Sequence, residues 1–423
     1  MFPCYMKKTT TCLSISLFLE KFSVLIFVFA IFVLIAAASC KKTVIEKVYE
    51  SKDSSNINSP EFIITNFGAK GDGKTDCSSI INDLILKMPA AGGTIVIPEG
   101  DFLLNNPIVV SRNFITIQGL NPGLRSNVDI GSSGVQQPGG GSKLLLGNTA
   151  IGIHVPSQPD VNGRKNRISG LVIKNLLISG GQGTKGTGIS IVQDNDGVRI
   201  ENVIGINLNI GIYAEAADAM IISTCWISEC RNSIEMKNGI QNMITNCQLG
   251  AQPSGITVNL TNQENFNFTS NHVYPDGDVN LQLNNTRYAN ISSNNFQSYY
   301  VGMIEVNGGH SNLVSSNVCW LRVPGDTARQ LRGKLNDYGV IRVSGDNHLI
   351  SSNSIACNWA NPSSNPVTIR SESGSGNRYQ NLKINDVSSS RVFYVNETSE
   401  IFNCVPYSKV YVDGDVSKVY VKY

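Results

Sequence analysis

Acidic side chains gather in one stretch of a chain that carries little charge elsewhere. Charged residues make up only 16% of the 423 residues. The acids of this stretch, at the middle of the chain, are Asp194, Asp196, Glu215, Asp218, Glu229 and Glu235. Cleavage or transfer of a glycosidic bond needs two carboxyls, one to protonate the leaving oxygen and one to take a proton from the nucleophile or to attack. The cluster suits glycosyl chemistry, and acids in solvated turns are the alternative interpretation.

Other chemistries find less support in the sequence. The four histidines are dispersed, at positions 154, 272, 310 and 348. They indicate neither a metal site nor a histidine-based triad, and we expect no cofactor. A formal net charge of +2 gives no reason to expect nucleic acid or an acidic polymer as a partner.

The stretch that holds the acids also shows a repeating unit. Short apolar triplets are separated by Asn, Gly, Asp and Ser, which is strand and turn chemistry rather than helix. A shared polar corner recurs at residues 175, 202, 224, 246, 270, 293, 316 and 352. The steps between these corners are 27, 22, 22, 24, 23, 23 and 36 residues. A period in the low twenties indicates a solenoid.

Composition decides between two kinds of solenoid. A leucine-rich repeat needs a Leu-rich template with a helical half, whereas these repeats are rich in Ile, Val, Asn and Ser. We therefore predict an all-β fold, a right-handed parallel β-helix of 22–24 residues per coil, with coils from about Ser111 to Asp386. The opening resembles that of many carbohydrate-active β-helices, so Cys77 to Met88 should form a helix that plugs the core.

Cysteines and loops add detail to this fold. Cys225 and Cys247 lie one repeat apart and should stack as small buried hydrophobes, with a disulfide as an option. Gly-, Ser- and Pro-rich segments at 119–142 and 155–165 read as loops. A third loop, at 320–338, carries Arg322, Asp326, Arg329, Arg332 and Asp337. This loop either closes over a polar ligand or is an ordinary solvated loop.

The N-terminus does not belong to the fold. An apolar run from Phe22 to Ala38 follows two lysines and ends at Cys40. It resembles a bacterial lipoprotein signal with Cys40 as the lipidated residue, and a plain membrane anchor is the alternative. The predicted arrangement is a signal peptide at 1–39, a flexible tether at 40–60 and one β-helix catalytic domain at 61–423. We expect the protein in the bacterial cell envelope, lipid-anchored to the membrane.

Several stretches resemble one enzyme family over about residues 140–385. They are GISIVQDNDGVRIENV, EAADAMIISTCWISECRNSIEM, SNLVSSNVCWLRVPGD and YGVIRVSGDNHLISSN. The chain is similar here to the inulin fructotransferases of glycoside hydrolase family 91, trimeric parallel β-helix enzymes. The family's Gly-Ala-Asp and Ala-Glu-Cys motifs correspond to Ala217-Asp218 and Ser228-Glu229-Cys230, with Ala216 and Ser228 departing from the pattern.

The resemblance implies an activity and a site. In such a reaction a fructosyl hydroxyl of inulin attacks the next anomeric carbon, and a difructose dianhydride is released. Asp218 and Glu229 would be the catalytic carboxyls. The expected substrate-binding residues are Asp194, Asn195, Asp196, Arg322 and Arg332. A homotrimer is expected, with a fructan or a fructose disaccharide as substrate.

Eleven residues separate the two carboxyls, and a straight strand of that length spans roughly 36 Å. Either a bend near Thr224-Cys225 brings them together, or they meet through a neighbouring subunit. Three alternative functions stay open: a dianhydride hydrolase of the same family, a pectin-active β-helix, and a non-catalytic glycan-binding surface solenoid.

Overall fold

The computed structural model describes residues 61–123, 140–163, 166–180, 185–325, 330–335, 337–360, 366–385, 391–395, 398–404, 410–412 and 420–422. The signal peptide, the tether and Cys40 lie outside these residues, as do Asp326 and Arg329. Within the described residues, no helix is long and apolar enough to cross a membrane.

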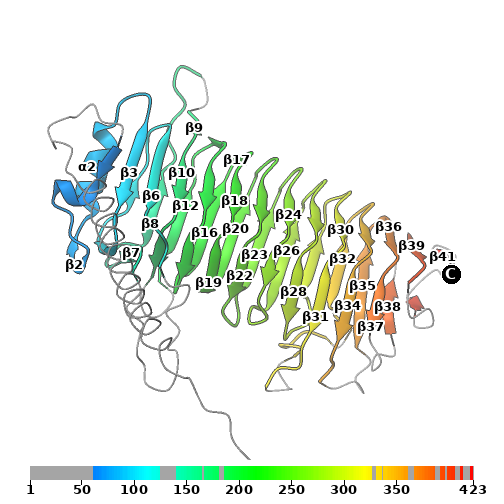
Figure 1. Ribbon diagram of the computed structural model, residues 1–423. Coiled ribbons are helices and arrows are strands. Elements are labelled where there is room, and N and C mark those ends of the chain that lie inside the picture. The colour runs from blue at the N-terminus through cyan, green and yellow to red at the C-terminus, as the bar shows by residue number, and fades with distance from the viewer. Residues whose placement is uncertain are drawn as a thin grey trace, which may run out of the picture. The chain divides into compact units, whose positions relative to one another are not determined.

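Three long sheets, here called A, B and C, wind in turn around one core, and every strand pairing in them is parallel (Figure 1). Sheet A contains β1 (Glu61–Ile63), β3 (Gly93–Ile97), β6 (Ile115–Gly119), β10 (Val172–Lys174), β14 (Arg199–Glu201), β18 (Ile221–Ser223), β21 (Met243–Thr245), β24 (Asn267–Thr269), β27 (Asn290–Ser292), β30 (Leu313–Ser315), β33 (Leu349–Ser351), β36 (Ser375–Gln380), β39 (Thr398–Phe402) and β41 (Tyr420–Lys422). Sheet B contains β2 (Asp72–Asp76), β4 (Gly100–Leu104), β7 (Ser142–Leu146), β11 (Leu177–Ser179), β15 (Ile204–Ile206), β19 (Trp226–Cys230), β22 (Gln248–Ala251), β25 (His272–Val273), β28 (Asn295–Ser298), β31 (Val318–Leu321), β34 (Ser354–Cys357) and β37 (Lys383–Asn385).

Sheet C closes the third side. It contains β5 (Ile108–Val109), β8 (Ile151–Val155), β12 (Thr187–Ile191), β16 (Ile210–Glu215), β20 (Asn232–Lys237), β23 (Ile256–Thr261), β26 (Val279–Asn284), β29 (Ile304–Asn307), β32 (Ile341–Ser344), β35 (Val367–Ser373), β38 (Arg391–Val395) and β40 (Val410–Val412). A short sheet lies between sheets C and A and contains β9 (Ile168–Ser169), β13 (Asn195–Asp196) and β17 (Ala217–Asp218). The predicted parallel β-helix is confirmed.

The repeating corners explain the period of the sequence. Each marks the passage from sheet A to sheet B, and all eight have a left-handed backbone with φ between 50° and 59°. Asn and short polar residues tolerate this conformation better than bulky ones. The corner residues are Asn175, Asn202, Thr224, Asn246, Ser270, Ser293, Ser316 and Ser352.

Just inside these corners, one buried side chain from each coil forms a column. The residue type in this column changes along the β-helix. Asn271, Asn294 and Asn317 each donate a side-chain N–H to the Asn side chain of the next coil, over 3.0–3.1 Å. In earlier coils Cys225 and Cys247 occupy the same column as free, buried thiols, which confirms that they stack. The amide column satisfies buried polar groups, and the thiols fill the same space with weak S–H contacts to backbone oxygens at 3.3 Å.

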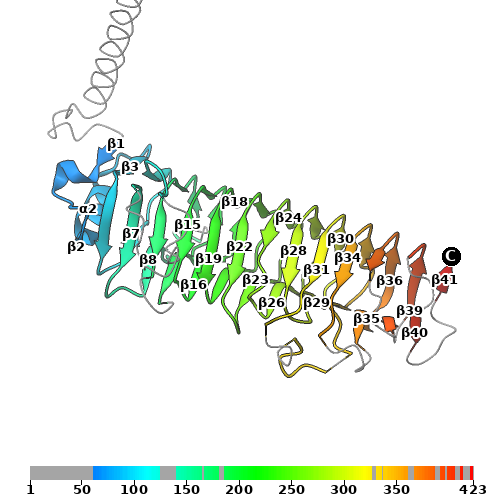
Figure 2. The same ribbon diagram turned by 60° about the horizontal axis from the view of Figure 1, so that its bottom comes forward.

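A helix closes the N-terminal end of the core. α2 (Ser78–Lys87) follows the 3₁₀ turn η1 (Ile64–Phe67), and it lies at the blue end of the solenoid in both views (Figures 1 and 2). Its buried side chains Ile81, Leu84 and Ile85 join the main core, which confirms the plug. The expected coil limits were too narrow, because paired strands run from β1 to β41.

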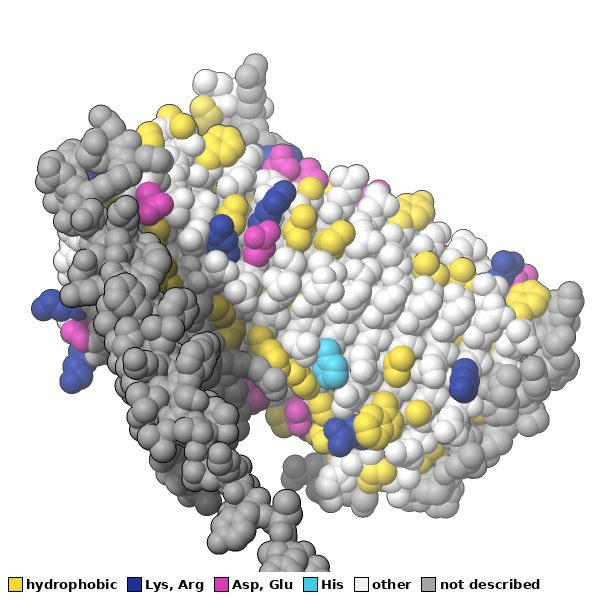
Figure 3. All heavy atoms as spheres, viewed as in Figure 1, with side chains coloured by type: hydrophobic (Ala, Val, Ile, Leu, Met, Phe, Trp, Pro, Cys, Tyr) yellow, Lys and Arg dark blue, Asp and Glu magenta, His cyan; other side chains and the backbone are white. Residues whose placement is uncertain are grey.

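Charged side chains are few on the face that Figure 3 shows, and they are scattered there among hydrophobic and uncharged groups. The places where charges meet therefore stand out as candidate sites.

Candidate functional site

One column of residues follows the turn between sheets C and A, and we call it the Asp218 corner. Its first members pair in the short sheet, where Asp196 lies opposite Asp218. Single parallel bridges then continue the column to later coils. Its members in order are Ser169, Asp196, Asp218, Ile240, Glu264, Arg287, His310 and Asp346.

Arg167 organises the acids at this corner. Its Nε lies 2.7 Å from Asp194 Oδ1, and its Nη1 lies 3.2 Å from Asp218 Oδ2 and 4.0 Å from Asp196 Oδ2. Burial lowers the pKa of Arg167, but the hydrogen bond and charge of Asp194, with the charges of Asp218 and Asp196, raise it overall. A fixed positive charge therefore faces Asp218, and this arrangement suits a proton acceptor.

Asn195 has a structural part at the same turn. It is fully buried, and its side-chain N–H groups donate to the backbone oxygens of Gln193 and Glu215. The Asp194 carboxylate contacts Arg167, so of the Asp-Asn-Asp turn Asp196 has the most exposed carboxylate, at 50%. The predicted contacts of these residues with substrate stay predictions.

Glu229 lies elsewhere, where sheet B turns into sheet C, and we call this the Glu229 corner. Glu229 has a left-handed backbone with φ 53° and interrupts the register between β19 and β22. Beside this bulge the following coils form a second column, here called the Glu229 column, and its first member Gln252 donates a side-chain N–H to the Glu229 backbone oxygen at 3.1 Å. The members of the column are Gln252, Asp276, Tyr299 and Arg322.

The acids of this corner, Glu229 and Asp276, both have raised pKa values. Partial desolvation, reinforced by the charge of Asp276, raises the pKa of Glu229. Partial desolvation also raises the pKa of Asp276, and Arg322 offsets part of that rise. A carboxyl that keeps its proton to higher pH suits a general acid.

Aromatic rings flank these acids on sheet B. Trp226 stacks on Tyr274 with ring centroids 5.6 Å apart, and His272 lies 5.0 Å from Tyr274. The Arg322 guanidinium lies 4.8 Å from the Trp320 ring and 5.3 Å from the Tyr299 ring. Flat rings next to polar groups are suited to the apolar faces and hydroxyls of a sugar.

Arg332 anchors the third loop at the same corner. It forms an ion pair of 3.0 Å with Asp278, donates to Ser254 Oγ at 3.2 Å and lies 4.0 Å over the Tyr300 ring. Only 17% of its side chain is exposed. Arg332 therefore holds the described part of the loop against the β-helix, and its contact with substrate stays a prediction.

Within this chain the two predicted catalytic carboxyls lie at opposite ends of neighbouring strands of sheet C. Asp218 follows β16, while Glu229 precedes β20, which is the partner strand of β16. Each strand has six residues, so sheet C separates the corners by about 20 Å. The expected bend at Thr224 exists, but it leads from sheet A to sheet B and does not bring the acids together.

Sequence reasoning missed Arg167 and Asp276. Arg167 contacts acids 27 and 51 residues away, so no local motif marks it. Asp276 could have been found by counting repeats, since Gln252, Asp276, Tyr299 and Arg322 follow one another at steps of 24, 23 and 23 residues.

Known proteins match this chain over most of its length. An inulin fructotransferase (DFA-I-forming) of Arthrobacter globiformis is 28% identical over 310 residues, which cover 67% of this chain and 77% of that protein. A crystal structure of DFA-IIIase from Arthrobacter chlorophenolicus A6 in complex with DFA-III superposes with TM-score 0.75 at 20% identity, covering 85% of this chain and 98% of that one.

The same enzyme in complex with GF2 superposes with TM-score 0.71 at 22% identity, over 81% of this chain and 93% of that chain. No family model matches the sequence. The chain is similar in sequence to this inulin fructotransferase, and it has the β-helix fold of the DFA-IIIase.

Proposed function

We propose that this protein is a fructan-active enzyme that transfers a fructosyl group within β-2,1-fructan and releases a difructose dianhydride. The homologous fructotransferase supports the reaction class. The observation that carries the proposal is the pair of unlike acids, Asp218 facing Arg167 and Glu229 beside Asp276. In this scheme Asp218 accepts the proton of the attacking hydroxyl, and Glu229 protonates the leaving oxygen.

The proposed reaction balances without water. A carbon–oxygen bond forms between the attacking fructosyl hydroxyl and the neighbouring anomeric carbon. The bond from that carbon to the leaving fructan oxygen breaks. One proton goes to Asp218 and one leaves Glu229, so the two carboxyls must exchange protons with solvent before the next turnover. A single displacement of this kind needs the acids about 6.5–9.5 Å apart.

That requirement leads to the oligomer. Because sheet C holds the two acids about 20 Å apart in one protomer, Asp218 of one protomer must meet Glu229 of a neighbour. A ring of protomers whose C sheets face the rotation axis would place each Asp218 corner against the next Glu229 corner. We propose a homotrimer of this kind, with one site at each of its interfaces.

Mixed oligomers test this arrangement directly. Asp218→Asn and Glu229→Gln homo-oligomers should both be inactive on inulin. If the two variants are coexpressed, random mixing should restore about a quarter of the sites, because a site needs the intact acid from each side. A mixture as inactive as its parents, with mixed oligomers present in native mass spectra, would contradict a shared site.

The product assay distinguishes the transferase from a hydrolase of the same family. Purified protein lacking residues 1–39 would be incubated with inulin and separately with difructose dianhydrides. The proposal expects dianhydride from inulin. Conversion of dianhydrides to disaccharide with no action on inulin would assign the hydrolase, and inactivity on both with retained inulin binding would favour the glycan-binding solenoid.

For the N-terminus we propose lipidation at Cys40 and attachment to the bacterial cell envelope. The support is the apolar run from Phe22 to Ala38 that leads through small residues to this cysteine. Cys40→Ala should give an unprocessed precursor or a soluble product with the β-helix intact. Wild-type protein that keeps residues 1–39 would favour the plain membrane anchor.

A further inference from the structure

We propose that a groove along the Asp218 corner binds the fructan chain beyond the reacting linkage. This inference rests on the proposed function, because it extends the same site along the solenoid. The groove has a volume of about 430 Å³ and begins one coil after Asp218, at Ile240, the bridge partner of Asp218. It reaches His310, three coils further on, which is about 14 Å along the axis.

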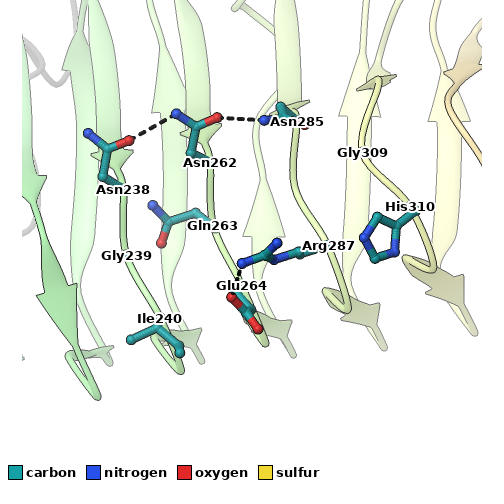
Figure 4. A pocket seen from close by; sticks show the side chains of 10 residues that line it. All are labelled: Asn238, Gly239, Ile240, Asn262, Gln263, Glu264, Asn285, Arg287, Gly309 and His310. Carbon is teal, nitrogen blue, oxygen red and sulfur yellow. Dashed lines mark hydrogen bonds and ion pairs between the residues drawn. The ribbon is translucent and has the colours of Figure 1, made fainter.

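One wall of the groove is a ladder of side-chain amides (Figure 4). Asn262 donates to Asn238 Oδ1 and Asn285 donates to Asn262 Oδ1, both over 2.9 Å. Each of these bonds uses one of the two N–H donors that a carboxamide carries. The second donor and further lone pairs remain for a ligand, at a spacing set by the coils.

The other wall carries Ile240, Glu264, Arg287 and His310 (Figure 4). Glu264 and Arg287 hydrogen-bond to each other, so the groove holds a paired cation and anion among amides, Ile240 and the His310 imidazole. Such a surface suits a neutral chain rich in hydroxyls better than a charged polymer. At its far end Tyr288 is 51% exposed and meets the His310 ring edge-on at 5.0 Å, which adds a flat apolar surface for a sugar ring.

The position of the groove predicts its role. Arg287 lies three coils from Asp218 and His310 lies four, about 14 and 19 Å along the axis. Neither side chain can therefore reach the reacting bond. They should hold a long chain and make no difference to a trisaccharide, so their loss should appear in KM for inulin and leave kcat unchanged.

The test compares Arg287→Gln combined with His310→Ala against wild type, on inulin and on a fructan trisaccharide. Two or three lost hydrogen bonds should raise KM for inulin about fivefold to tenfold, with KM for the trisaccharide unchanged. The matched control is Arg378→Gln, which breaks the exposed Arg378–Glu400 pair on sheet A, outside the groove. Equal KM values for variant and wild type on inulin would overturn the proposal.

Two further measurements separate this proposal from others. Inulin binding to Glu229→Gln, measured by calorimetry, tests the groove even if the wild type turns over no fructan. Weaker binding on adding the Arg287 and His310 changes would support the groove, and unchanged binding would overturn it. Light scattering gives the oligomeric state. Dissociation of the groove variant would overturn the proposal, because it would show that these residues hold copies together and do not act on the fructan chain.

Discussion

The two ends of sheet C are built from different chemistry. At the Asp218 corner three carboxylates share one guanidinium, that of Arg167. At the Glu229 corner two acids with raised pKa values lie among aromatic rings, and Arg322 lies close to one of them. The comparison teaches that the strands of sheet C separate two unlike groups of acids. Under the proposed function, a complete acid–base pair therefore requires a second copy.

The repeating architecture of the solenoid allows the two corners to carry different side chains. Each corner is a column in which one position per coil can change without altering the strands beside it. The Asp218 column runs through acids, Ile240, Arg287 and His310, while the Glu229 column runs through Gln252, Asp276, Tyr299 and Arg322. Chemistry at one corner can therefore vary independently of the core and of the other corner.

The strongest test removes either acid. Asp218→Asn and Glu229→Gln should each lower kcat on inulin by about 10²–10⁴-fold, because each removes one partner in proton transfer at almost constant volume. The double variant should be little worse than the poorer single variant, since the pair acts as a unit. Glu201→Gln, on β14 of sheet A, is the matched control and should stay near wild type. Near wild-type rates for both acid variants would leave the glycan-binding solenoid as the better interpretation.

A buried histidine lowers the stability of the fold at acid pH. It therefore limits the pH range in which activity at the two corners can be measured. His348 is 1% exposed, and burial lowers its pKa from 6.5 to about 4. The unfolded chain binds this proton more readily, so the folded state loses stability as pH falls from 6.5 towards 4. The loss should reach about 3 kcal/mol at the acid end. Urea unfolding at pH 7 and pH 4.5 would show a smaller difference for His348→Asn, and an equal difference would contradict the assignment.

Variants of Arg167 test the environment of Asp218, the proposed proton acceptor, and leave the Glu229 corner unchanged. Arg167→Met removes the charge facing Asp218 and should lower kcat/KM about 10–100-fold, the value of a charge-assisted hydrogen bond. Arg167→Lys should recover part of the loss, because lysine restores the positive charge but not the planar set of guanidinium donors. Arg199→Met on sheet A is the control. If the Met variant turns over inulin normally, Asp218 does not depend on its guanidinium.

The sequence was enough to predict the coils and not enough to predict the site. The corner period follows from local backbone needs, since Asn202 or Ser293 must adopt positive φ whatever lies nearby. The contact between Arg167 and Asp218 spans 51 residues and depends on which coils lie side by side. The separation of Asp218 from Glu229 depends on the width of sheet C, which spacing along the chain does not encode.

The smallest expected effect is that of replacing Asp276, which lies near the proposed proton donor Glu229. Asp276 carries a negative charge near Glu229 and helps to raise its pKa beyond the effect of partial desolvation. Asp276→Asn removes that charge, so the pKa of Glu229 should fall and the donor should lose its proton at lower pH. The alkaline limb of kcat/KM against pH should therefore move towards acid, with little change below the limb.

The control is Asp101→Asn, which breaks the ion pair between Asp101 and Lys143, both distant from Glu229. It should leave the alkaline limb of kcat/KM in place. A limb that stays fixed in the Asp276 variant would mean that Glu229 is not the group whose deprotonation ends activity. A limb that moves towards alkali would mean that the charge of Asp276 does not raise the pKa of the donor. Either result would remove the electrostatic distinction between the two ends of sheet C, whereas the expected shift would identify Glu229 as the acid by a property that Asp218 does not share.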